Sequence, residues 1–409
     1  MAIDKKVLKS SIEREQNELA RSAEREKIKG LKNLNVPPLR FPEFQGKWEK
    51  KRISEFCTLL KGTGISKDQL STNGKPCILY GELYTKYKAE IINEVLSCTE
   101  LDANTLVKSK VNDVIIPCSG ETAIDIATAR CIPFDDVLLG GDLNILRSNK
   151  VNGSFLAYQL NGKRKYDIAR VAQGVSVVHL YGEHLNNIVI SLPVIEEQQK
   201  ISRLLHLLDE RIATQNKIIE DLKKLKSAII DLLFHSIRDA NTVRLGDIAH
   251  ITNGIGDVQD ANTEHKKDWF PFFDRSEELK WFPTYSFDKE AIIYAGEGQS
   301  FYPRYYNGKF ALHQRCYAIT DFASCILPKY CYYFMTTLNS YFVRNSVGST
   351  VPSLRMDVFQ KAEIKPPPIS KQQHICKIID ALCSKFEIEQ NSANSLQIQK
   401  RYLLSQMFI

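Results

Sequence analysis

Two segments of this 409-residue chain repeat one another, and the repeat limits the architectures that are possible. Leu192–Ile201 reads LPVIEEQQKI and Pro366–Ile375 reads PPPISKQQHI, so the two Gln-Gln pairs lie 174 positions apart. At the same offset, Gly174–Leu180 falls on Gly348–Leu354. Because a sequence repeat indicates a repeated architecture, the chain is expected to contain two related bodies.

Each half opens in the same way and continues with mixed helix and strand patterns. Arg52–Phe56 matches Arg244–Ile248 at an offset of 192 positions. Short apolar runs bounded by Gly, Asn or Asp are typical of buried strands, and longer apolar runs at equivalent places favour helices. The predicted strands are Cys77–Tyr80, Val114–Pro117 and Ala291–Tyr294, and the predicted helices are Phe155–Leu160 and Tyr330–Met335.

A heptad pattern follows each Gln-Gln pair. Apolar residues recur at alternating spacings of four and three, which predicts a long helix that packs along a seam. Polar residues interrupt both seams at matching places, Gln215 with Glu389 and Lys226 with Lys400, and this favours packing of the two helices on each other. At about 1.5 Å per residue, each helix would be roughly 50 Å long. The apolar seam positions are Ile201, Leu205, Leu208, Ile212, Ile219 and Leu222 in the first helix and Ile375, Ile379, Leu382, Phe386, Leu396 and Leu403 in the second.

These patterns predict an α+β fold in which two mixed α/β bodies are separated by two long antiparallel, coiled-coil-like helices, with a pseudo-twofold internal repeat. Residues 1–35 are predicted to form a charged N-terminal helix or a solvated arm, and we hypothesise that it packs beside the long helices or a partner subunit. The other predicted boundaries are 36–195 for the first body, 196–238 for the first long helix, 239–369 for the second body and 370–409 for the second long helix.

Charge is concentrated at one end of the chain. The formal net charge is +7, and residues 1–52 contain fourteen Lys and Arg against eight Asp and Glu. A basic balance is compatible with an anionic partner, but the rest of the chain is nearly neutral. Any surface of the two bodies that binds an anionic partner must therefore come from locally grouped cations.

Several classes of protein are disfavoured by what the sequence lacks. No signal-peptide core or run of 18 apolar residues occurs, so the chain is expected in the cytoplasm without membrane contact. The ten cysteines show no zinc-type spacing and are expected to be free thiols, with no metal site. No Walker lysine motif and no Asn/Asp-Pro-Pro-aromatic motif is present; Lys365–Ile369 lacks both the acid and the ring, and Asp357 with Glu363 and Lys365 is too cramped for a nuclease site. The chain is therefore not expected to be an enzyme.

From Val36 to Ile409, the sequence resembles the specificity subunits of type I restriction-modification systems. The resemblance rests on VPPLRFPEF at Val36–Phe44 with Trp48, on Gly174–Leu180, on the Pro-x-x-Glu-Gln-like turn before each heptad helix, and on the duplicated layout. In the first body, Tyr80–Tyr87, Ser119–Thr122 and Gly140–Leu143 look like one recurring version of the family's target-recognition domain. The second body has instead Gly296–Ser300 and an aromatic run, which indicates a different recognition-domain type.

The resemblance implies sequence-specific binding of double-stranded DNA. Each target-recognition domain would read one half of a bipartite, asymmetric target, and the paired helices would set the spacing. Two methyltransferase subunits, which modify adenine N6, would dock along the helices, and restriction and translocase subunits would join the same assembly. No cofactor is expected on this chain; S-adenosylmethionine, ATP and Mg²⁺ would be bound by the partner subunits.

Candidate DNA contacts in the first body fall into two groups. The first mixes lysines with tyrosines, which suits phosphate anchoring beside a groove, although an ordinary solvated edge would look the same. The second is a basic patch at a helix start, more suited to backbone than to base contacts. The candidates are Lys61, Lys67, Tyr80, Tyr84, Lys86 and Tyr87 in the first group, Lys163, Arg164, Lys165 and Arg170 in the second, and the hydroxyl of Ser176.

In the second body, Phe301–Lys309 combines cations, rings and an Asn-Gly pair that predicts a hairpin turn. Arg304 is the foremost candidate, because a guanidinium can donate two hydrogen bonds to guanine. Gly174 and Gly348 are expected to serve backbone geometry. The remaining candidates are Tyr305, Lys309, Arg315, Ser349 and Thr350, of which Arg315 could equally be an ordinary surface charge.

Two other functions fit the sequence. One is a free-standing DNA-binding regulator built from the same two bodies, which would bind its site tightly without a methyltransferase. The other is a coiled-coil adaptor without a DNA role, which would tolerate charge reversal of Arg304 and Lys163-Arg164.

Overall fold

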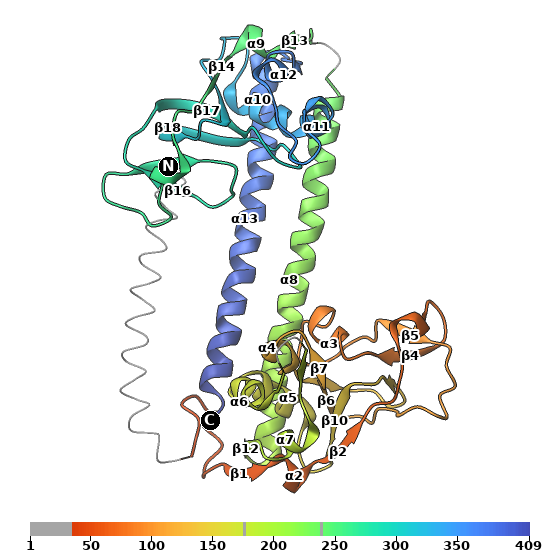
Figure 1. Cartoon of the computed structure of the whole chain (residues 1–409). Helices are drawn as coiled ribbons and strands as arrows, with labels where there is room; N and C mark the ends of the chain where they lie inside the picture. The colour runs from red at the N-terminus through yellow and green to blue at the C-terminus, as the bar shows by residue number, and fades with distance from the viewer. Residues whose placement is uncertain (1–34, 175–176, 238–239) are drawn as a thin grey trace. The chain divides into compact units, whose positions relative to one another are not determined.

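The computed structural model describes residues 35–174, 177–237 and 240–409 (Figure 1). These residues divide into two units. Unit 1 contains the described residues up to Gln215 together with Ser392–Ile409, and unit 2 contains Asn216–Asn391. Residues 1–34 of the predicted N-terminal arm and the candidate Ser176 lie outside the described residues.

The described part of unit 1 carries two four-stranded sheets, ordered β2-β10-β6-β8 and β3-β5-β4-β9, and the two-stranded sheets β1-β12 and β11-β7. Its strands are β1 (Glu49–Arg52), β2 (Thr58–Lys61), β3 (Leu70–Ser71), β4 (Lys75–Ile78), β5 (Ser97–Thr99), β6 (Asp113–Pro117), β7 (Ser119–Gly120), β8 (Arg130–Ile132), β9 (Leu138–Leu139), β10 (Leu143–Arg147), β11 (Val178–His179) and β12 (Val189–Leu192). Its short helices are α2 (Ile53–Phe56), η1 (Lys67–Gln69), α3 (Glu82–Thr85), α4 (Ala123–Ile126), α5 (Gly153–Asn161), α6 (Lys165–Val171) and α7 (Gly182–Asn186).

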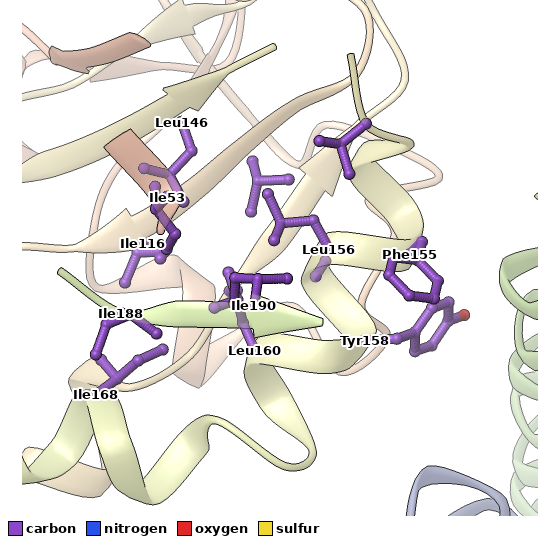
Figure 2. Close-up of a cluster of buried hydrophobic side chains, with 14 of the residues drawn as sticks. Ile53, Ile116, Leu146, Phe155, Leu156, Tyr158, Leu160, Ile168, Ile188 and Ile190 are labelled. Carbon is purple, nitrogen blue, oxygen red and sulfur yellow. The ribbon is translucent and has the colours of Figure 1, made fainter. Parts of the chain in front are cut away.

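Helix α5 covers the core of unit 1. It begins where the side chain of Asn152 accepts a hydrogen bond from the backbone N–H of Phe155 at 2.8 Å, a regular helix cap. Figure 2 shows Leu156 and Leu160 of α5 gathered with Ile116 of β6 and Ile190 of β12. All five residues of β6 are buried, so the apolar run predicted there lies inside the core.

The described part of unit 2 carries a six-stranded sheet, ordered β14-β19-β17-β18-β15-β16, and the pair β13-β20. Its strands are β13 (Val243–Arg244), β14 (His250–Asn253), β15 (Phe270–Phe273), β16 (Lys280–Phe282), β17 (Phe287–Ala295), β18 (Arg304–Leu312), β19 (Cys316–Thr320) and β20 (Glu363–Ile364). Its short helices are α9 (Leu245–Ile248), η2 (Val258–Asp260), α10 (Pro328–Met335), η3 (Thr336–Leu338), α11 (Asn339–Asn345) and α12 (Met356–Gln360).

The hairpin turn predicted at Asn307-Gly308 is wrong. Both residues lie within β18, where Asn307 pairs with Glu290 and Gly308 with Lys289 of β17. Gly308 keeps a φ of +128°, which glycine adopts at little cost. The continuous pairing of β18 with Phe287–Ile293 of β17 outweighs the local turn preference of the dipeptide.

The internal repeat is visible strand by strand. Ile115 of β6 pairs with Arg130, the first residue of β8, and Ile293 of β17 pairs with Arg304, the first residue of β18. The junctions with the long helices are also equivalent. The side-chain oxygen of Gln198 accepts the backbone N–H of Asn152 at 3.0 Å, and that of Gln372 accepts the backbone N–H of Leu327, directly before α10, at 2.8 Å.

The two predicted long helices are α8 (Ile195–His235) and α13 (Ile369–Gln406). Unit 1 contains the first part of α8 and the last part of α13, whereas unit 2 contains the last part of α8 and the first part of α13. Each unit thus receives opposite ends of the two helices, as the predicted antiparallel pair requires. Among the seam positions, Ile201, Leu205, Leu208, Ile219, Ile375, Ile379 and Leu396 are buried, and Ile212, Leu222, Leu382, Phe386 and Leu403 are half-buried.

Both long helices contribute to the core of each unit. Ile201 and Leu205 of α8 pack in the unit 1 core with Met407 and Phe408, which follow α13. Phe234 of α8 packs in the unit 2 core with Ile375 and Ile379 of α13. Across the described ranges, no helix has the length and apolar character needed to cross a membrane.

Candidate nucleic-acid interface

The loops that follow the central strands are joined by the same backbone hydrogen bonds in both units. Four N–H groups of unit 1 have an equivalent donor in unit 2, bonded to an equivalent carbonyl. In unit 1 these bonds are Gly62 to Leu143 (3.0 Å), Cys118 to Asp142 (2.7 Å), Leu180 to Cys118 (2.7 Å) and Gly140 to Ile78 (2.9 Å); in unit 2 they are Gly254 to Cys316 (3.2 Å), Gly296 to Arg315 (2.9 Å), Leu354 to Gly296 (2.7 Å) and His313 to Phe273 (2.9 Å).

We call the area formed by these segments the loop surface of each unit. In unit 1 it comprises Gly174 and the ranges 62–64, 79–86, 118–122, 140–142 and 177–180. In unit 2 it comprises the ranges 254–258, 274–280, 296–300, 313–315 and 347–354. Polar side chains displayed on a rigid sheet framework can contact base edges and phosphates.

Glycines allow the loops to lie this close together. A Cβ on Gly62 would lie 1.9 Å from the carbonyl oxygen of Gly140, and one on Gly254 would lie 2.1 Å from that of Leu312. Gly174 and Gly348 have φ values of +123° and +104°, in the region that disfavours residues with side chains. The predicted backbone role of Gly174 and Gly348 is therefore confirmed.

The loop surface of unit 2 borders an open cavity of about 560 Å³ that is lined by both polar and apolar residues. Donors and acceptors of several kinds lie in its wall, which suits hydrogen bonding to base edges. Burial alone would raise the pKa of Asp274, but hydrogen bonds from Lys280 (2.6 Å) and Ser276 hold the pKa of this carboxyl below its usual value. The polar and charged side chains of the wall include Asp274, Arg275, Ser276, Lys280, Glu297, His313, Gln314 and Arg315.

Equivalent positions on the two loop surfaces carry different chemistry. In unit 1, Ser119 donates a hydrogen bond to the carboxylate of Asp142 at 3.1 Å. At the equivalent place in unit 2, Arg315 forms an ion pair with Glu297 at 2.7 Å. One loop surface therefore presents an acid and a hydroxyl where the other presents a guanidinium and an acid, so the two cannot favour the same base edges.

Arg304 does not line the cavity, but it is bonded to two residues that do. Its Nη2 donates to the backbone carbonyls of Asp274 at 3.0 Å and Ser276 at 2.5 Å. The equivalent Arg130 donates to the carbonyls of Leu83 at 3.1 Å and Tyr87 at 2.8 Å, and burial lowers its pKa from the usual arginine value. Both guanidinium groups thus hold a loop against the sheet, and a guanine contact by Arg304 would compete with its carbonyl bonds.

The lysine and tyrosine candidates of unit 1 divide by exposure. Lys61 and Lys67 are exposed, and Tyr80 and Tyr84 are half-buried on the loop surface. Burial raises the pKa of Tyr84, and the nearby Tyr80, Glu121 and Asp125 add to this. Lys86 is paired with Glu82 at 2.6 Å. Tyr87 is buried, and its hydroxyl accepts the backbone N–H of Leu96, so Tyr87 packs inside the unit rather than facing a ligand.

The arginines of the basic patch at α6 form ion pairs and hydrogen bonds within unit 1. Arg164 pairs with Asp167 at 3.1 Å and donates to the carbonyl of Ile409 at 3.0 Å. Arg170 is exposed and lies 3.6 Å from Asp167. Burial lowers the pKa of Lys165, and the nearby Arg130 lowers it further. Lys163 is exposed.

The remaining candidates of unit 2 are scattered. The hydroxyl of Tyr305 donates to Glu290, and Lys309 lies 4.6 Å from the centre of the Tyr285 ring, so these two are away from the cavity wall. Ser349 and Thr350 are exposed beside Gly348 on the loop surface. The loop surfaces also contain Asp142, Lys280, His313 and Gln314, which the sequence analysis did not select. Aligning the starts of β10 and β19, rather than looking for cation clusters, would have singled out Asp142, because it matches Arg315.

A sheet-and-helix body that occurs twice, each time followed by a long helix and presenting polar loops, defines a duplicated DNA-specificity architecture. The chain belongs to the family described as type I restriction modification DNA specificity domain, whose model matches residues 45–224 and 237–397. The predicted family is confirmed, and with it the assignment as a specificity subunit rather than a catalytic one.

Named relatives agree with this assignment. The chain is 29% identical over 165 residues to the type I restriction enzyme EcoDI specificity subunit of Escherichia coli, a match covering 40% of this chain and 36% of that protein. It is 27% identical over 202 residues to the MjaVIII specificity subunit of Methanocaldococcus jannaschii, covering 48% of this chain and 43% of that protein. The matched parts thus span less than half of each relative.

Two solved structures share the fold. The type I restriction-modification S subunit from M. genitalium superposes with a TM-score of 0.63 at 16% identity, covering 91% of this chain and 99% of that one. A chain from a study of complex assembly and conformational transition of the type I R-M system superposes with a TM-score of 0.56 at 16% identity and the same coverage. At this identity the likeness supports the fold, and the predicted α+β architecture with two long helices is confirmed.

Proposed function

We propose that this chain reads a bipartite, asymmetric sequence in double-stranded DNA, with one half-site bound by the loop surface of each unit. The observation that carries the proposal is the contrast between Ser119 with Asp142 and Glu297 with Arg315 at equivalent positions. A duplicated reader with identical loops would favour a symmetric target. Two readers with different hydrogen-bonding groups favour two unlike half-sites.

We further propose that the chain positions two methyltransferase subunits and the restriction and translocase subunits on that target. The methyltransferases would carry out adenine N6 methylation on a base turned out of the stack. S-adenosylmethionine, ATP and Mg²⁺ would be bound by those partners and not by this chain. The proposed location of the assembly is the cytoplasm.

The test is to co-express the full chain with its methyltransferase and to map modified adenines across a genome. We expect one split motif with two different halves, which is absent when this chain is omitted. A palindromic motif would contradict the asymmetric target. If methylation does not depend on the chain while the purified chain alone binds a defined site tightly, the protein is a free-standing regulator instead.

A further inference from the structure

One pair of equivalent hollows lies outside the loop surfaces, at the beginning of each long helix. In unit 1 a hollow of about 570 Å³ is bordered by Asn152 and Ser154 at the start of α5 and by the first turns of α8. In unit 2 a hollow of about 430 Å³ is bordered by Leu327 and Lys329 at the start of α10 and by the first turns of α13. The hydrogen bonds from Asn152 to Gln198 and from Leu327 to Gln372 build both hollows in the same way.

Two side chains recur in the walls of both hollows. Gln199 and Gln373 are exposed amides 174 positions apart, and one helical turn further the cations Arg203 and Lys377 occur at the same offset. Other wall positions differ between the repeats, as His206 does from Asp380 at that offset. A charge kept in both walls while neighbouring residues diverge points to one ligand chemistry common to both hollows.

The recurring cations are available for a ligand. Within the parts of the chain that the structure describes, the side chains of Arg203 and Lys377 have no ion pair or hydrogen bond. Neighbouring lysines are used internally, since Lys200 pairs with Glu43 and Lys329 with Asp380 at 2.8 Å. A guanidinium or ammonium group beside an amide donor favours a carboxylate, with which it forms charge-assisted hydrogen bonds.

We propose that each hollow receives an acidic side chain from one of two copies of the methyltransferase subunit. The inference rests on the proposed function, which supplies a partner present in two copies. Two equivalent hollows in one chain bind two copies of the same element, as the repeated faces of a pseudo-symmetric protein do. Arg203 and Gln199 hold one copy, and Lys377 and Gln373 hold the other.

Stoichiometry tests the proposal directly. The full chain is co-expressed with the methyltransferase as wild type, Arg203→Glu, Lys377→Glu and the double variant, and the mass of each purified complex is measured. We expect two methyltransferase copies on the wild type, one on each single variant and none on the double variant. Lys150→Glu and Lys267→Glu are matched controls, because both lysines are exposed and outside the hollows, and both should retain two copies.

The outcomes separate the inference from the proposed function. If the wild type binds two copies and both single variants also bind two, the hollows are not the docking sites, and the proposed function stands. If the wild type binds no methyltransferase, the proposed function fails and the inference fails with it. Thermal unfolding of each variant monitors folding, and the neutral changes Arg203→Gln and Lys377→Gln replace any glutamate variant that does not fold; these should weaken the same copy.

Discussion

Lys400 and Lys226 occupy equivalent positions in the two long helices, yet only Lys400 is enclosed by carboxylates. The Nζ atom of Lys400 lies 2.5 Å from Oδ1 of Asp209 and 2.5 Å from Oε2 of Glu90. Tyr158 completes the group, because its hydroxyl donates to Asp209 at 2.7 Å. Lys226 instead lines a cavity of about 280 Å³ in unit 2. The repeat therefore conserves a lysine but gives it two different environments.

Removing the buried cation should destabilise unit 1. Burial opposes ionisation of Glu90, but the neighbouring Lys400 lowers the pKa of this carboxyl below its usual value. Lys400→Met would leave Glu90 and Asp209 buried without their cation, and losing one partner of a buried ion pair costs about 3–5 kcal/mol. Denaturant unfolding should show a loss of this size. Lys226→Met is the matched control, expected to change the free energy of unfolding by about 0.5 kcal/mol or less; equal losses in the two variants would contradict the assignment.

Arg304 is expected to contribute to the stability of unit 2 and not to the choice of the DNA motif. Arg304→Lys keeps the charge but cannot donate in the same geometry to the carbonyls of Asp274 and Ser276. We expect the free energy of unfolding of unit 2 to fall by about 1–3 kcal/mol, which is the usual cost of leaving buried polar groups unsatisfied. Methylation mapping should show the same motif at lower occupancy. A changed base in the motif with unchanged stability would instead make Arg304 a base reader.

Substitutions on one loop surface should alter one half-site only. Arg315→Ala removes the guanidinium of unit 2, and Asp142→Ala removes the carboxylate at the equivalent place in unit 1. A bidentate base contact contributes about 1–3 kcal/mol of discrimination, so each change should relax its own half of the motif at one position. Genome-wide methylation maps of both variants provide the measurement. Relaxation of both halves by either variant would rule out independent reading.

Lowering the pH should remove the stability that the Asp274 carboxylate contributes to unit 2 through its hydrogen bonds. Its folded-state pKa is lower than that of an unfolded aspartate, about 3.9. The stabilisation is therefore present above that unfolded value and is lost as the pH falls through the folded value. Unfolding of unit 2 measured from pH 6 to pH 3 should show this acid-dependent loss, and Asp274→Asn should lack it. Asp288→Asn, at an exposed strand position, should keep the wild-type pH profile; a flattened profile there would contradict the assignment to Asp274.

The burial of the seam residues could be predicted from the sequence, but the environments of the candidate DNA contacts could not. The heptad pattern located Ile201 and Leu205, because a buried stripe recurs with the period of a helix. The cluster of Lys61, Lys86 and Tyr87 divides in the structure into an exposed lysine, a paired lysine and a buried ring. Residue type alone does not distinguish these three environments, since each depends on neighbours from another part of the chain.

The sequence by itself determined the duplication, the two long helices and the family, because offsets and periodicity are properties of the order of residues. Only the tertiary structure decided which charged groups form ion pairs or hydrogen bonds within the protein and which line a cavity. Lys400 donates a hydrogen bond to Glu90, which is 310 positions away in the sequence, and Arg304 donates one to the backbone carbonyl of Asp274, which is 30 positions away. Burial and pairing depend on which residues the fold brings together, so equivalent residues of the repeat can form buried ion pairs in one unit and line a cavity in the other.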